Sequence, residues 1–110
     1  MNQLSKNYDL EERTAKFGET IIKFCRTLKQ DSISSSIIHQ LVHSSTSIGA
    51  NYMETNGASS KKDFQHKISI CKKEAQETKH WLRMLATCLK ESQELTLIFQ
   101  KITSSLRNRA

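Results

Sequence analysis

The stretch from residue 61 to residue 90, KKDFQHKISICKKEAQETKHWLRMLATCLK, decides the fold prediction. Its apolar and small residues recur at alternating steps of four and three, and they are Phe64, Ile68, Cys71, Ala75, Thr78, Leu82, Leu85 and Leu89. This seven-residue repeat predicts one helix of about 45 Å, at ~1.5 Å per residue, that packs at a shallow angle against neighbouring helices.

Three other segments also predict helices. The first ladder is Leu10, Phe17, Ile21, Phe24 and Leu28, the second is Ile37, Ile38, Leu41, Val42, Ile48 and Tyr52, and the fourth is Leu95, Ile98, Phe99, Ile102 and Leu106. The first helix begins at Asp9, which has capping-box spacing to Glu12. Polar residues 29–32 end it, and Ser92 caps the fourth helix.

The boundaries of the second and third helices have their own signals. Asn56 and Gly57 predict a left-handed stop after the second helix, and Ser60 with Asp63 predicts the start of the third. Gly49 inside the second helix costs about 1 kcal/mol relative to alanine, so it predicts a close approach by another backbone.

The composition supports an all-α fold. The chain has 110 residues, which suits a single domain, and it contains three glycines and no proline, whereas β-sandwiches and barrels need frequent turn residues. The prediction is an antiparallel up-down-up-down four-helix bundle over residues 9–110, preceded by a flexible leader over residues 1–8.

The hydropathy pattern and the cysteines predict a cytoplasmic protein. No run approaches the ~18 apolar residues of a membrane span, and the N-terminal residues do not resemble a secretory signal. The three cysteines, Cys25, Cys71 and Cys88, form no CxxC pair, which favours reduced thiols.

Enzyme chemistry has little support in the sequence. Glu77 and His80 form one Glu-x-x-His, but a di-iron bundle needs two such motifs and further glutamates. His39 and His43 are four residues apart without the glutamate of a zinc protease helix. Cys71 lies on the apolar ladder and is expected to be a buried, inert thiol. We therefore expect no catalytic site, metal, cofactor or small-molecule substrate.

Charge is the remaining signal for function. Residues 1–60 carry six basic and six acidic side chains, whereas residues 61–110 carry eleven basic and five acidic ones, so the net charge of +6 lies in the second half. The candidate nucleic-acid contacts are Lys61, Lys62, Lys72, Lys73, Lys79, Arg83 and Lys90. Such residues can follow a phosphate backbone. The alternative is an ordinary solvated lysine-rich face on a scaffold that binds only proteins.

Two motifs carry a resemblance to a known family. Residues 45–54, STSIGANYME, resemble the TSIGANY-x-E signature of the bacterial 23S rRNA-intervening sequence proteins. Asp63-Phe64, Lys67, residues 73–78 (KEAQET) and Trp81-Leu82 resemble the second signature of the same family. The resemblance covers nearly the whole chain from Asp9.

The resemblance implies a four-helix bundle that assembles into a ring, a homopentamer by expectation, without enzymatic activity. It also implies a relation to the bundle-shaped accessory proteins of diversity-generating retroelements, which bind nucleic acid and a reverse transcriptase. RNA or DNA and further copies of the chain are therefore the expected partners.

Four polar signature residues, Asn51, Glu54, Lys67 and Glu74, flank the apolar ladders. Burial without partners would cost each of them several kcal/mol. They are expected to form an interhelical or intersubunit polar network that fixes the register of the helices. The alternative is that they lie on a solvated rim.

Overall fold

The computed structural model describes residues 9–89 and 100–104. Three long helices carry most of these residues: α2 (Leu10–Cys25), α3 (Ser32–Glu54) and α4 (Lys61–Cys88). A short 3₁₀ turn, η1 (Thr55–Gly57), follows α3, and residues 100–104 are also helical. Neither range contains a strand, so the all-α prediction is confirmed for this part of the chain.

The start of α2 differs from the prediction in its capping. The helix begins at Leu10 as expected, but the side chain of Asp9 makes no capping hydrogen bond. Asp9 has φ 26° and ψ 58°, whereas an N-cap side chain reaches the helix N–H groups from an extended backbone. The predicted Asp9–Glu12 capping box is therefore wrong.

A complete capping box starts α3 instead. The Asp31 carboxylate accepts hydrogen bonds from the backbone N–H groups of Ile33 (3.0 Å) and Ser34 (2.8 Å), and the Ser34 hydroxyl accepts one from the Asp31 N–H (3.0 Å). The hydrogen bonds from the Ser34 backbone and hydroxyl are the main cause that lowers the pKa of Asp31. The connection from Arg26 to Asp31 is short, so α2 and α3 pack as neighbours.

The end of α3 also differs from the prediction. No described glycine has a positive φ, so Gly57 does not form a left-handed stop. The helix tightens into η1, where the Ala58 N–H donates to the Thr55 carbonyl oxygen at 3.1 Å and the Thr55 hydroxyl donates to the Tyr52 carbonyl oxygen at 2.6 Å. These bonds satisfy carbonyl groups that a left-handed stop would otherwise cap.

The start of α4 confirms its predicted signal. The Ser60 hydroxyl accepts a hydrogen bond from the Asp63 N–H at 3.0 Å, and the Asp63 carboxylate accepts one from the Ser59 N–H at 2.9 Å. The bond from Ser59 is the main cause that lowers the pKa of Asp63. From this start, α4 continues without interruption to Cys88, close to the predicted end at residue 90.

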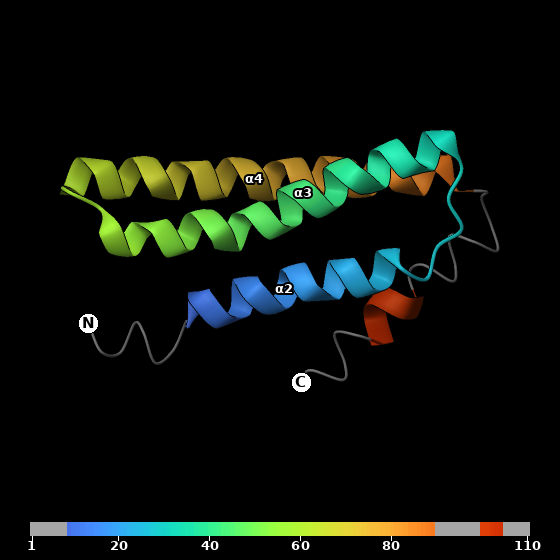
Figure 1. Ribbon diagram of the computed structural model, residues 1–110, viewed down its shortest axis with the longest axis horizontal. Helices are drawn as coiled ribbons and strands as arrows, with labels where there is room; N and C mark the ends of the chain where they lie inside the picture. The colour runs from blue at the N-terminus through green and yellow to red at the C-terminus, as the bar shows by residue number, and fades with distance from the viewer. Residues whose placement is uncertain (1–8, 90–99, 105–110) are drawn as a thin grey trace.

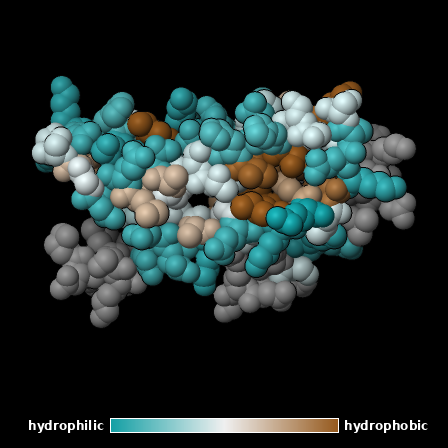
Figure 2. Space-filling model, viewed as in Figure 1, coloured by the Kyte–Doolittle hydropathy of each residue, from teal (hydrophilic) through white to brown (hydrophobic). Residues whose placement is uncertain are grey.

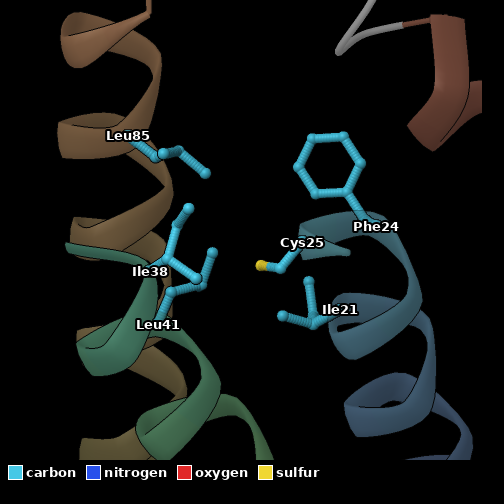
Figure 3. Close-up of a cluster of buried hydrophobic side chains, with 6 residues drawn as sticks. All are labelled: Ile21, Phe24, Cys25, Ile38, Leu41 and Leu85. Carbon is cyan, nitrogen blue, oxygen red and sulfur yellow. The ribbon is translucent and has the colours of Figure 1, made fainter. Parts of the chain in front are cut away.

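The hydrophobic core lies toward the end of the molecule where α2 ends and α3 begins. It consists of Ile21, Phe24, Cys25, Ile38, Leu41 and Leu85, which face one another across α2, α3 and α4 (Figure 3). Leu28 lies beyond the end of α2 but still packs against this cluster. Figure 2 shows hydrophobic residues gathered over the same half of the molecule, on the face turned toward the viewer.

The opposite half of the molecule is built from small residues and from apolar residues that stay partly exposed. Leu10 and Phe17 of α2 are 37% and 36% exposed, and Phe64 of α4 is 44% exposed. Both helices begin at this end (Figure 1). The apolar ladder residues of α2 and α4 are therefore more exposed at this end than at the end that contains the core. None of the described helices is apolar over a length sufficient to cross a membrane.

Helix α3 lies between α2 and α4 and contacts both (Figure 1). A Cβ atom on Gly49 would lie 3.0 Å from the Thr14 Oγ1 atom, and one on Gly18 would lie 3.4 Å from the Thr46 Cγ2 atom. This confirms the close approach predicted from Gly49. Thr14 comes before Gly18 along α2, whereas the partner of Thr14, Gly49, comes after the partner of Gly18, Thr46, along α3.

Hydroxyl groups join α3 to α4 in the interior. The Thr78 hydroxyl lies 3.0 Å from the Ser44 hydroxyl oxygen and 2.9 Å from the Glu74 carbonyl oxygen. The Thr78 and Ser44 side chains are both buried. About one turn farther along α3 and two turns back along α4, the Cys71 sulfur lies 3.7 Å from the Ile48 carbonyl oxygen. These contacts fix which residues of α3 and α4 lie side by side.

The two glycines make opposite predictions for stability. Gly57→Ala is expected to raise the free energy of unfolding by about 0.4–1 kcal/mol, because nothing lies within 4 Å of the new methyl group and the unfolded chain loses freedom. Gly49→Ala is expected to lower it by about 1 kcal/mol, because overpacking against Thr14 costs more than the ~1 kcal/mol gained in helix propensity. Urea denaturation of both variants measures the difference, and a stabilised Gly49→Ala variant would show that the contact is loose.

Candidate nucleic-acid interface

Six of the seven basic residues predicted to contact nucleic acid lie in α4 and are exposed: Lys61, Lys62, Lys72, Lys73, Lys79 and Arg83. None of the six forms an ion pair with a carboxylate in the described part of the chain. The seventh, Lys90, lies outside the described residues. The cations are therefore available to an external partner.

Four of these cations form a line along α4. At 3.6 residues per turn, Lys61, Lys72, Lys79 and Arg83 fall within about 40° of arc around the helix axis and span roughly 33 Å. We call these four residues the basic row. The basic row borders the edge of the apolar ladder that carries Ile68 and Ala75, and all four members are exposed.

The carboxylates of α4 lie elsewhere on the helix. Asp63, Glu74 and Glu77 fall on the opposite flank of the apolar ladder from the basic row, by the same helical geometry. The number of charges along the sequence does not show this separation, because it ignores the angle of each residue around the helix axis. Plotting each charged residue by its angle around the helix reveals this segregation from the sequence alone.

This separation of charge determines what the basic row can do. Because no carboxylate of α4 lies within the row, its positive potential is not cancelled locally. Phosphate groups repeat regularly along a nucleic-acid strand, and each phosphate neutralised by lysine or arginine releases a bound counterion. A row of roughly this length can therefore contact several phosphates of one polyanion.

The polar signature residues Asn51 and Lys67 have their partners on their own helices. The Asn51 side-chain amide donates to the Ser47 carbonyl oxygen at 2.8 Å, and the Lys67 Nζ lies 3.8 Å from the Asp63 Oδ1 atom. The Asp63 and Lys67 side chains are both about one quarter exposed. No hydrogen bond or ion pair among the described residues joins Asn51 or Lys67 to Glu54 or Glu74.

Glu54 and Glu74 both affect the pKa of the Cys71 thiol. Burial is the main cause that raises the pKa of the Cys71 thiol, and the negative charges of Glu54 and Glu74 raise it further. Glu54 is exposed, but the Oε1 atom of Glu74 is buried and has no hydrogen-bond partner among residues 9–89 and 100–104. A buried carboxylate oxygen without a donor is costly, and Glu74 is the member of this set for which the described part of the chain supplies none.

The remaining candidates for chemistry are dispersed. Burial raises the pKa of the Cys25 thiol to about 11, so this thiol stays protonated near neutral pH. His80 is exposed and its ring packs edge-to-face against Trp81, with the centroids 4.8 Å apart. Within residues 9–89 and 100–104, no group of three or more His, Cys, Asp and Glu side chains is placed to hold a metal ion.

Comparison with known proteins identifies the family. The family model for 23S rRNA-intervening sequence proteins matches residues 6–109, which is nearly the entire chain. The comparisons with curated proteins and with solved structures give no match. The match includes both motifs that carry the resemblance, residues 45–54 and the segment from Asp63 to Leu82. The chain therefore belongs to the 23S rRNA-intervening sequence protein family.

Proposed function

We propose that this protein is a non-enzymatic, oligomeric four-helix bundle that associates with RNA through the basic row of α4. The observation that carries the proposal is the charge segregation on this helix. The four cations of the basic row lie exposed on one flank, while Asp63, Glu74 and Glu77 lie on the other. A solubilising surface needs only a net charge, whereas a polyanion site needs a continuous positive strip.

The proposed bundle is the antiparallel up-down-up-down form, with the fourth helix running from Ser92. Residues 90–99, which include Ser92, lie outside the described residues, so support comes from the segment that follows. Residues 100–104 are helical, and Ile102, one of the predicted ladder residues, packs against the hydrophobic core. A helix that places Ile102 there would complete the cover over α2 and α4.

We propose that the chain forms a homo-oligomer, a ring of five by the family resemblance. The partly exposed Phe17 and Phe64 support a partner surface, since a second copy would remove their apolar area from water. A ring would repeat the +6 charge of each chain around one assembly. Several weak phosphate contacts would then act together through avidity.

The same exposed apolar residues favour a second candidate function. In this alternative, the chain is a protein-interaction scaffold that makes no contact with nucleic acid, and its positive charge provides solubility. Both candidates place the protein in the cytoplasm without catalysis or a cofactor. The protonated Cys25 thiol is consistent with a non-catalytic protein in a reducing compartment.

The first experiment is a gel-shift titration with structured RNA and with duplex DNA at low and high salt. Reversing the charges of Lys72, Lys79 and Arg83 to glutamate is expected to weaken RNA binding by roughly a hundredfold or more, because phosphate contacts are lost and like charges are introduced. The dependence of log K on log salt is also expected to become shallower, by about 0.7–0.9 for each lost contact.

A matched variant controls for net charge. Lys23, Arg26 and Lys29 are also two lysines and one arginine, all exposed but outside α4, so their reversal makes the same change of −6. This variant is expected to retain most of the binding. Equal loss in both triple variants, persistence of binding without the basic row, or no binding by the wild type at low salt would favour the scaffold alternative.

The second experiment tests Glu74 as part of an intersubunit network. If a neighbouring copy donates to its buried Oε1 atom, Glu74→Ala is expected to reduce the mass of the assembly in light scattering and to lower its melting temperature. Glu77→Ala, which removes the same charge one turn away, is the control and is expected to leave both unchanged. An unchanged or more stable Glu74→Ala assembly would contradict the network, since removing an unpartnered buried carboxylate relieves a cost.

A further inference from the structure

The outward face of α3 carries two histidines that neither the bundle nor the basic row uses. His39 and His43 are both exposed, and they lie within the 23-residue helix rather than at an end. At a separation of four residues, their side chains lie about 40° apart around the helix and on the same face. Their imidazole rings are therefore neighbours along one line of the helix.

The backbone that holds these histidines is already ordered by the core. Ile38 and Leu41 alternate with them along the sequence and are 6% and 0% exposed. Because α3 is fixed on its inner side by these residues, His39 and His43 are held one helical turn apart on the outer side. A ligand that bridges the two rings would not have to pay for ordering the helix.

The electrostatic setting of the pair suits a cation. Helix α3 contains no lysine or arginine, although such residues make up 17 of the 110 in the chain. Its neighbours on the same face are small, and they include Ser36 and Ser47. No basic side chain of this helix would repel a dication, and no bulky one would cover it.

We propose that His39 and His43 chelate a divalent transition-metal ion of the zinc class. Imidazole nitrogens bind Zn²⁺ at about 2.0–2.1 Å, and two histidines four residues apart on a helix can reach one ion. The absence of the intervening glutamate, which separates this pair from a zinc protease helix, removes the general base but not the ligands. The remaining positions on the ion are filled by water, so the site binds the metal without hydrolytic chemistry.

Calorimetric titration of the full chain with Zn²⁺, in a buffer without chelating groups, tests the proposal. The wild type is expected to bind one ion per chain at this site, and His43→Gln is expected to bind roughly tenfold or more weakly, because the second ligand no longer acts at high effective concentration. Saturating Zn²⁺ is also expected to raise the melting temperature of the wild type, since binding favours the folded helix.

A double variant, Gln40→His with His43→Gln, keeps the number of histidines but places two of them on adjacent residues, about 100° apart around the helix. It is expected to lose Zn²⁺ affinity as His43→Gln does, whereas His66→Gln on α4 is expected to bind like the wild type. Wild-type affinity in the double variant would show that binding depends on histidine number rather than spacing. That result, or a wild type that binds no Zn²⁺, would overturn the proposal.

Discussion

Helix α3 can lie close to both α2 and α4 because small residues occupy key positions on its two packing sides. Gly49 meets Thr14 of α2, and Ser44 meets Thr78 of α4 through a 3.0 Å hydroxyl contact. Larger side chains at these positions would separate the helices by the width of an added methyl group or more, and close packing does not tolerate such a gap. The positions of α2 and α4 depend on these two contacts. The contact with α4 also determines which flank of that helix faces solvent.

Much of the fold could be predicted because it is specified locally. The ladder of α4 follows the helical period, and Ser60 and Asp63 form the hydrogen bond that their spacing indicates. The predictions of helix ends failed where two local backbone conformations compete. Asp9 has the residue type of a cap but a backbone conformation that directs its side chain away, and Gly57 can form a left-handed stop but continues into a 3₁₀ turn instead.

The candidate site was predictable in part for the same reason. Exposure of Lys72 and Lys79 follows from their position outside the apolar period, so periodicity alone locates them. Spacing does not reveal which polar groups will be satisfied by neighbours. Lys67 pairs with Asp63 on its own helix, whereas Glu74 keeps a buried oxygen for which no described residue is a donor, and this difference depends on where α3 lies against α4.

The arrangement of α4 also bears on how such a protein can diverge. Leu82, Leu85 and Leu89 of its ladder pack in or against the core, while the Lys72, Lys79 and Arg83 side chains are exposed. Substitutions at the solvent positions leave side-chain packing intact, so folding imposes little restraint on them. A lineage could therefore strengthen, weaken or redirect its attraction for a charged partner by single exchanges, while the interior stays under a separate and stricter selection.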